Sequence, residues 1–314
     1  MRVLVTGAAG FVGSNVVHEA AELELEVVGL ARSRPSRPDP RCDWVSCDLL
    51  DARATRAAVL DAEPAAIVHT AILNDFSRIY ADRRLAWESY VGVTRTLADA
   101  ANELGAQLVT VSTDWVFDGT EGGYDEASPP NPVNLYGVLK TMSELVTLER
   151  ARRGTVTRIA GVFGTHRASP ELPRRQDVGF GYFVSSLVDA LESGEPFTVW
   201  ESDEINMRAT PSLASHSARL MLELCRLGLT GIYHCVCAEA VTRMELARAS
   251  TETFELDAAL LRVGPPQPEA LPLAPIPRDT SLQAHDTAVA LGVSLASVRE
   301  LLELYRTERA SASA

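Results

Sequence analysis

No run of apolar residues in the 314-residue chain reaches the length of about 18 that a membrane-spanning helix requires, so no membrane partner is expected. The N-terminus also lacks a charged segment followed by an apolar stretch, and it opens directly into the apolar run Val3–Val5. Because a secretory leader would show that pattern, we expect a cytoplasmic protein. No internal repeat is visible either.

Cysteine is scarce, and its placement gives no sign of a metal site. The five cysteines are odd in number and scattered, and Cys42 and Cys47 lack the spacing of zinc ligands. Cys235 and Cys237 alternate within a predicted strand and would share one face. We predict reduced thiols in or near the core, and no metal.

The charge balance excludes a polyanionic partner. The net charge of −13 would repel nucleic acid. A small anionic ligand stays compatible with the sequence, because local arginines and helix N-termini outweigh the average field. The length is close to the upper limit for one hydrophobic core, which predicts a large domain with a smaller lobe attached.

Strand and helix patterns alternate through the first half of the chain. This alternation predicts an α/β fold, a Rossmann-type doubly wound parallel sheet with helices on both faces. The predicted strands are Arg2–Thr6, Glu26–Leu30, Asp43–Cys47, Ala66–Thr70, Gln107–Ser112 and Thr155–Ala160, and the predicted helices are Phe11–Leu23, Leu85–Leu104 and Leu135–Arg152.

After Gly164 the rhythm changes, and we predict a smaller C-terminal substrate-binding lobe. The division is a core over 1–164, to which part of 205–235 returns, a lobe over 165–306 and a flexible tail over 307–314. The predicted elements are a loop at Thr165–Gly179, helices at Phe180–Ser193, Pro211–Leu227, Thr242–Phe254 and Val293–Tyr305, strands at Phe197–Trp200 and Gly231–Val236, and an irregular proline-rich stretch at Gly264–Pro277. Thr242 and Glu245 have the spacing of a capping box.

Three glycines after the first strand predict a dinucleotide site. Gly7 suits the sharp turn from strand to helix, Gly10 a close approach to the pyrophosphate, and Gly13 tight packing of the helix on the sheet. The intervening Phe11 and Val12 lie at the helix N-terminus, whose unpaired N–H groups favour phosphate.

The second strand ends without the acidic residue that would bind the ribose hydroxyls of NAD. Arg32 and Ser33 stand there instead and are suited to a 2′-phosphate. We therefore predict a preference for NADPH, with NADH possible as a second cofactor. The alternative is that Arg32, Arg34 and Arg37 belong to a solvated loop.

Tyr136 and Lys140 are one helical turn apart and share a face, which predicts proton transfer beside the dinucleotide. The pKa of a free tyrosine is about 10, and a nearby ammonium is expected to lower it. Tyr136 would donate a proton to a carbonyl oxygen, and Thr113, at the end of a strand, would orient the same oxygen. Lys140 would also hydrogen-bond the nicotinamide ribose.

The motifs together resemble the extended short-chain dehydrogenase/reductases, and among them the dTDP-4-dehydrorhamnose reductases. The resemblance rests on the Gly-x-x-Gly-x-x-Gly spacing, on Ser112–Gly119 (Ser-Thr-Asp-Trp-Val-Phe-Asp-Gly), on Pro132-x-Asn134-x-Tyr136-Gly137-x-x-Lys140, and on looser matches at Arg158–Gly164, Gly231–His234, Thr242–Ala247 and Pro277–Leu282. It implies NADPH- or NADH-dependent reduction of the 4-keto group of a nucleotide-linked 6-deoxyhexose, in deoxysugar biosynthesis.

The resemblance also assigns further residues. It places Asp48 and Leu49 at the adenine, and Thr70 and Ala71 beneath the cofactor. Many relatives form homodimers through sheet-face helices, for which the helices that begin near Leu85 and Leu135 are candidates. One relative is a non-catalytic regulatory subunit of methionine adenosyltransferase.

Three segments depart from that family. Tyr90–Thr94 stands where the family often has an asparagine in Asn-Val-x-Gly-Thr, Asp203–Pro211 replaces an Asp-Gln-x-Gly-x-Pro-Thr segment, and Ile72–Arg84 lacks the usual acidic and cysteine-bearing pattern. These departures bear on which sugar is bound more than on the chemistry.

A nucleotide-sugar substrate carries a pyrophosphate, which needs cationic partners. Arg208, just before a helix-start signal, is the favoured candidate, ahead of Arg167, Arg174 and Arg175; all four are also compatible with a solvated surface. Trp115 is expected to line the sugar pocket or to pack in the core. Two other functions stay open: an epimerase or ketoreductase on another substrate, and a dinucleotide-binding regulatory protein.

Overall fold

Seven parallel strands form the central sheet of the computed structural model, which describes residues 1–169, 175–271 and 274–313. Their order is β11-β6-β5-β4-β1-β2-β3, and every neighbouring pair is parallel. The predicted doubly wound sheet is therefore confirmed. The strands are β1 (Arg2–Thr6), β2 (Glu26–Ala31), β3 (Cys42–Ser46), β4 (Ala66–His69), β5 (Gln107–Thr113), β6 (Gly154–Ile159) and β11 (Gly231–His234).

Helices cover both faces of this sheet, because its strands alternate apolar side chains between two cores. In β1, Val3 and Val5 pack with α1 and α8, whereas Leu4 packs on the opposite face. The helices of one face are α1 (Phe11–Glu22) and α8 (Ala214–Leu227), and those of the other are α2 (Ala52–Ala62), α5 (Val93–Leu104) and α6 (Leu135–Arg150).

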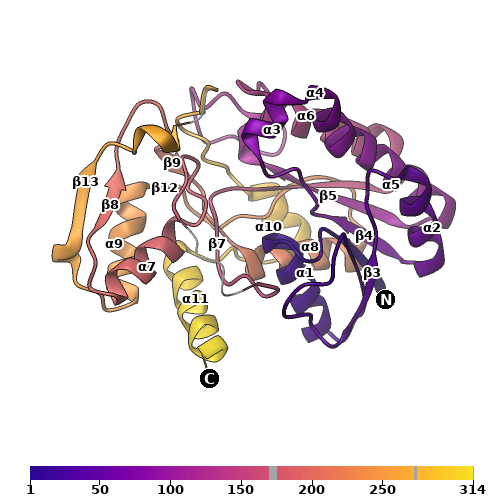
Figure 1. Ribbon diagram of the computed structural model, residues 1–314, viewed down its shortest axis with the longest axis horizontal. Helices are drawn as coiled ribbons and strands as arrows, with labels where there is room; N and C mark the ends of the chain where they lie inside the picture. The colour runs from indigo at the N-terminus through magenta and orange to yellow at the C-terminus, as the bar shows by residue number, and fades with distance from the viewer. Residues whose placement is uncertain (170–174, 272–273, 314) are drawn as a thin grey trace.

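A third apolar cluster lies beside the sheet, at the left of Figure 1. Two-stranded pairs and three helices build it: β8 (Phe197–Trp200) with β13 (Leu261–Gly264), β7 (Val162–Phe163) with β10 (Ser212–Leu213), β9 (Arg208–Ala209) with β12 (Val241–Thr242), and helices α7 (Phe183–Glu192), α9 (Arg243–Thr253) and α11 (Val298–Ser313). The capping box predicted at Thr242 and Glu245 is confirmed at the start of α9.

Several boundaries differ from those predicted. The expected helix over 85–104 is three segments, α4 (Arg83–Trp87), the π-helix η1 (Glu88–Gly92) and α5. The last helix begins at Val298 and continues to Ser313, through the stretch expected as a frayed tail. Arg309 explains this, because it donates to Asp189 and Glu192 of α7.

Three helices were not predicted. In α2 and in α3 (Phe76–Ala81) the preceding Asp51 and Asp75 accept backbone N–H groups as N-caps, a signal the sequence does contain. The third, α10 (His285–Leu291), has no side-chain cap. Within the proline-rich stretch, Pro268–Ala270 forms one 3₁₀ turn.

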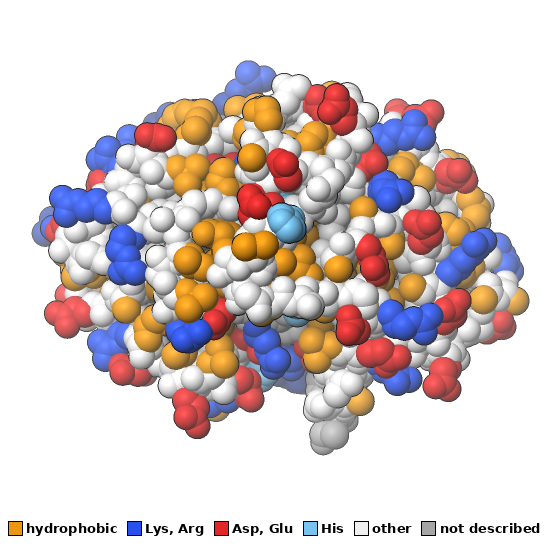
Figure 2. Space-filling model, turned by 180° about the vertical axis from the view of Figure 1, so that it is seen from behind, with side chains coloured by type: hydrophobic (Ala, Val, Ile, Leu, Met, Phe, Trp, Pro, Cys, Tyr) orange, Lys and Arg blue, Asp and Glu red, His pale blue; other side chains and the backbone are white. Residues whose placement is uncertain are grey.

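The cysteines are buried, as predicted, but not all where expected. Strand β11 ends at His234, so Cys235 and Cys237 lie beyond it and do not share a strand face. The surface opposite the view of Figure 1 intermingles acidic and basic side chains around its rim, with apolar ones gathered in its middle (Figure 2). Among the residues described, no helix is both long and apolar enough to cross a bilayer.

Candidate active site

A cavity of about 700 Å³ runs along the carboxyl ends of β1, β2, β4, β5 and β6, where open α/β sheets bind ligands. It brings together segments that are far apart in the sequence. The predicted cofactor and catalytic residues that line it are Gly7, Gly10, Phe11, Val12, Gly13, Arg32, Ser33, Asp48, Leu49, Thr70, Ala71, Thr113, Trp115, Tyr136 and Lys140.

The glycine loop has no room for side chains. Gly7 has φ +67°, and a Cβ built on it would lie 2.7 Å from the Ala71 Cα. A Cβ on Gly13 would lie 2.2 Å from the Gly7 carbonyl oxygen. No side chain caps the N-terminus of α1 at Gly10, so its first N–H groups stay available to an anion. The loop therefore fits a dinucleotide pyrophosphate.

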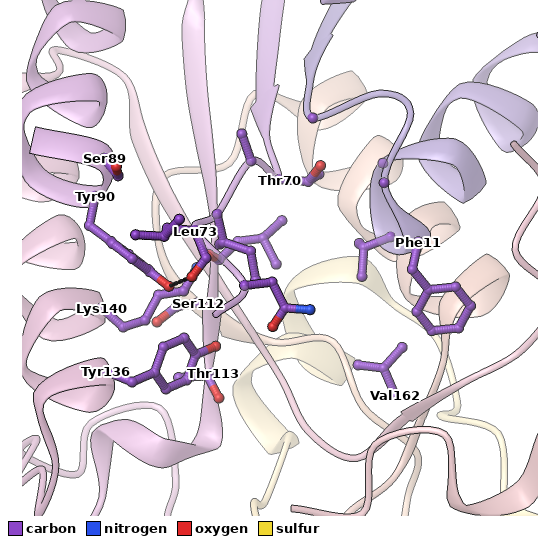
Figure 3. A pocket seen from close by; sticks show the side chains of 18 of the residues that line it. Phe11, Thr70, Leu73, Ser89, Tyr90, Ser112, Thr113, Tyr136, Lys140 and Val162 are labelled. Carbon is purple, nitrogen blue, oxygen red and sulfur yellow. Dashed lines mark hydrogen bonds between the residues drawn. The ribbon is translucent and has the colours of Figure 1, made fainter. Parts of the chain in front are cut away.

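The catalytic candidates come from two elements that touch closely. Asn134 caps α6 by accepting the Gly137 N–H at 2.9 Å. A Cβ on Gly137 would lie 2.2 Å from the Trp115 carbonyl oxygen, so the glycine lets α6 approach the end of β5. Tyr136 thereby lies beside Thr113, as Figure 3 shows, with Phe11 on the opposite wall.

Burial controls the protonation of the two residues on α6. It raises the pKa of Tyr136, although a hydrogen bond with Thr113 acts in the opposite direction. The expected lowering of the Tyr136 pKa by the ammonium was therefore wrong. Burial also lowers the pKa of Lys140 to about 8, and its Nζ donates to the Val111 carbonyl at 2.8 Å. Tyr136 thus holds its proton at neutral pH, as a proton donor must.

A carboxyl group that the sequence analysis did not assign lies at the same end of the cavity. Asp114 is buried, and it accepts hydrogen bonds from Thr113, at 3.0 Å, and from Thr280. Burial raises its pKa to about 7, against the effect of these two hydrogen bonds. The position of Asp114 directly after Thr113 was the sequence signal that could have identified it. Within the described ranges, no group of three or more His, Cys, Asp or Glu is placed to hold a metal ion.

Aromatic rings enclose the phenol of Tyr136. The rings of Phe76 and Trp115 lie 5.6 and 5.9 Å from its ring, centroid to centroid. Trp115 lines the cavity and is also buried, so its position fits either of the roles considered for it. Phe76 and Arg78 of α3 line the cavity as well, and both belong to the segment that departs from the family.

The arginines proposed for the substrate lie elsewhere. Arg208 is not among the residues that line the cavity; its Nε lies 3.9 Å from Asp279. The reason is the alternation along β9, which buries Ala209 and turns Arg208 to the surface. Arg167 pairs with Glu308 at 3.4 Å, Arg175 is exposed away from the cavity, and Arg174 lies outside the described residues.

A family model, the RmlD substrate binding domain, matches residues 1–310. The chain belongs to this family. Among curated relatives, the methionine adenosyltransferase 2 subunit beta of Xenopus tropicalis is 30% identical over 270 residues, covering 83% of this chain and 74% of that protein. The probable low-salt glycan biosynthesis reductase Agl14 of Haloferax volcanii is 27% identical over 262 residues, with 83% of each chain covered.

Solved structures agree on the fold. A hypothetical dTDP-4-dehydrorhamnose reductase from Sulfolobus tokodaii superposes with a TM-score of 0.76 at 25% identity, covering 95% of this chain and 97% of that one. The dTDP-4-dehydrorhamnose reductase of Bacillus anthracis, in complex with NADP, has a TM-score of 0.77 at 22% identity, with 98% and 99% covered. The resemblance drawn from the motifs is thereby confirmed.

Proposed function

We propose that the protein reduces the 4-keto group of a nucleotide-linked 6-deoxyhexose with NADPH, as a step in deoxysugar biosynthesis. The observation that carries this proposal is one cavity that joins the glycine loop to Tyr136, Lys140 and Thr113. Because the five cysteines are free thiols, a reducing compartment suits the protein, and we assign the reaction to the cytoplasm.

The proposed chemistry follows from the protonation of the site. The nicotinamide, when bound, supplies the hydride to the carbonyl carbon. Burial keeps the proton on the Tyr136 phenol, and Tyr136 donates this proton to the carbonyl oxygen. Thr113 donates to Asp114 in this structure, so Thr113 turns its hydroxyl to the substrate when Asp114 takes up a proton. Lys140, held by the Val111 carbonyl, keeps further donors free for the cofactor ribose.

The assay is direct. Purified protein is mixed with NADPH and with dTDP-4-keto-6-deoxyhexoses of both configurations at C5, and loss of the reduced-nicotinamide absorbance is followed. Rapid oxidation with one of them supports the proposal. If neither is reduced while NADPH binding is shown by fluorescence, the substrate is another carbonyl compound or the protein is not a reductase.

Cofactor preference is assigned to Arg32, which lines the cavity after β2. We expect Arg32→Ala to lower the ratio of kcat/KM with NADPH to kcat/KM with NADH by about 10- to 100-fold, because charge-assisted hydrogen bonds to the 2′-phosphate are lost. Arg34→Ala is the matched control, since Arg34 does not line the cavity. An unchanged ratio in Arg32→Ala would assign Arg32 to the solvated loop.

For the substrate diphosphate we assign Arg78 in place of Arg208. Helix α3 packs on the start of α6, where the Leu135 N–H donates to the Tyr80 hydroxyl at 3.0 Å, so Arg78 lies at the catalytic end of the cavity. Arg32 lies at the opposite, β2 end, and Lys140 is committed to the catalytic centre. Among the described residues Arg78 has no ion pair, which leaves its guanidinium for a phosphate.

Replacing each of the two arginines by alanine, one at a time, tests this assignment. Arg78→Ala is expected to raise the KM for the dTDP-linked substrate by about 10- to 100-fold, with the Kd for NADPH unchanged. Arg208→Ala should leave both constants unchanged. The reverse pattern would return the role to Arg208.

The regulatory alternative is favoured by one specific observation, the 30% identity to a methionine adenosyltransferase subunit. Against it stand Thr113, Tyr136 and Lys140, gathered at one end of the cavity although binding a dinucleotide alone does not require a proton donor. An epimerase would retain its nicotinamide and show no net oxidation in the assay above. The assay therefore separates a reductase of these sugars from the other two functions, and nicotinamide retained by the purified protein separates the epimerase from the regulatory protein.

A further inference from the structure

Tyr90 lies where the helix before β5 changes its hydrogen-bond pattern. It is the middle residue of the π-helix η1 (Glu88–Gly92), between α4 and α5. Single π-turns inside helices are rare and occur often at functional sites. Tyr90 is 3% exposed and lines the cavity, so the bulge brings a large aromatic side chain to the catalytic end.

The ring and the hydroxyl of Tyr90 contact three parts of the site. The Nζ of Lys140 lies 5.6 Å from the ring centroid, on its face. The ring of Tyr136 lies 6.1 Å away at 81°, edge to face. The hydroxyl donates to the Leu73 carbonyl at 3.0 Å, the dashed line in Figure 3, which ties η1 to the loop after β4. The hydroxyl thus fixes the ring between both α6 residues.

We propose that Tyr90 is a positioning residue whose ring face holds the Lys140 ammonium and whose ring orients Tyr136. The effect of Tyr90 on catalysis rests on the proposed function, whereas its effect on the protonation of Lys140 is independent of that function. An ammonium over a tyrosine face is stabilised by the ring quadrupole, and more so where water is excluded. Edge-to-face rings at this separation also attract each other.

The surroundings of Lys140 show why the ring matters. The titratable groups facing it are Tyr136 and Glu144 on α6, Tyr90 on η1 and His69 on β4. Burial lowers the pKa of His69 to about 3, so His69 is neutral and adds no charge. Glu144 raises the pKa of Lys140, against the larger effect of burial. The ring of Tyr90 also favours the charged amine, beside Glu144 and the Val111 carbonyl.

The composition makes this testable without a substrate. Lys140 is the single lysine among the 29 lysine and arginine residues of the sequence. Protein made without a lysine-containing tag and labelled with ¹³C at lysine Cε therefore gives one resonance, whose titration reports the protonation of Lys140. The variants are Tyr90→Leu, which removes the ring, Tyr90→Phe, which keeps the ring and removes the hydroxyl, and Val91→Ala, which removes neighbouring buried packing from the same turn.

The titration midpoint of Tyr90→Leu is expected to fall by about one pH unit, because the ammonium loses its ring partner. Tyr90→Phe and Val91→Ala should titrate close to the natural protein. The proposal is overturned if Tyr90→Leu titrates like the natural protein, or if either control moves as far as Tyr90→Leu. Thermal melting, measured alongside, reports lost packing separately from the midpoint.

The turnover assay with NADPH and keto sugars is kept apart from this titration. If the natural protein reduces none of the sugars while the Tyr90→Leu midpoint falls, the proposed function fails and the role of Tyr90 stands. If turnover is found but the midpoint does not move, only the role of Tyr90 fails.

Discussion

Replacing Tyr136 by phenylalanine is expected to lower kcat by about 10²- to 10⁴-fold, the usual contribution of a general acid. The substitution removes one oxygen and keeps the ring, so the contacts with Phe76 at 5.6 Å and Trp115 at 5.9 Å persist. The affinity for NADPH, measured by fluorescence, should not change. The loss would then belong to the proton-transfer step and not to folding or cofactor binding.

A matched control is available on the edge strand β11 of the sheet. Tyr233 lies on β11, its hydroxyl donates to the Thr230 carbonyl at 3.1 Å, and it does not line the cavity. Tyr233→Phe should keep full activity. A Tyr136→Phe protein with nearly normal kcat would remove Tyr136 from the mechanism and would shift attention to Asp114, whose pKa of about 7 also suits proton transfer.

The sequence is most informative where local sterics determine the answer. The glycine loop was predictable because the spacing of Gly7, Gly10 and Gly13 reflects local steric requirements. A Cβ at Gly13, for example, would meet the Gly7 carbonyl. The parallel sheet was predictable because strands buried on both faces read as apolar runs. These features depend on neighbours within one βα unit.

Features that depend on distant segments were not predictable. Nothing in the pattern around Tyr90 indicates a π-turn, since the extra residue is held by contacts with α6 and with the Leu73 carbonyl. Arg78 was overlooked because α3 is placed at the cavity by packing on α6, which lies more than fifty residues later in the sequence. The wrong direction for the Tyr136 pKa has the same origin, because burial is a property of the assembled site.

The C-terminal end of α11 is a further feature that depends on residues distant in sequence. Its last residues carry little apolar pattern, which favours a frayed tail. The structure continues α11 because Arg309 meets Asp189 and Glu192, more than a hundred residues earlier in sequence. An ion-pair partner at such a separation leaves no mark in local periodicity.

A buried ion pair between α6 and β6 carries the largest expected effect on stability. Arg158 of β6 and Glu144 of α6 are 0% and 3% exposed, and two hydrogen bonds of 3.0 and 2.8 Å join them. The guanidinium also lies 4.9 Å from the Phe117 ring centroid. Burial, and then Arg158, lower the pKa of His234 to about 3, so this histidine is neutral and accepts from Arg158 at 3.4 Å.

Arg158→Met is expected to lower the free energy of unfolding by about 3–5 kcal/mol, because it leaves the Glu144 carboxylate buried without a partner. Urea denaturation with linear extrapolation measures the change. The exposed pair of Arg226 and Glu223 is the control: Arg226→Met should cost less than about 1 kcal/mol.

The double variant Glu144→Leu/Arg158→Met distinguishes two cases. In one the ion pair itself stabilises the fold; in the other, stability is lost only when one charge is left buried without its partner. Apolar replacement of both partners removes the unpaired charge, so the double variant should recover most of the stability lost in Arg158→Met. If it does not, the bidentate geometry itself stabilises the protein. Glu144 lies one turn beyond Lys140 and raises its pKa, so the double variant should also titrate Lys140 at lower pH. A pair that looks purely structural would then also influence the charge of Lys140.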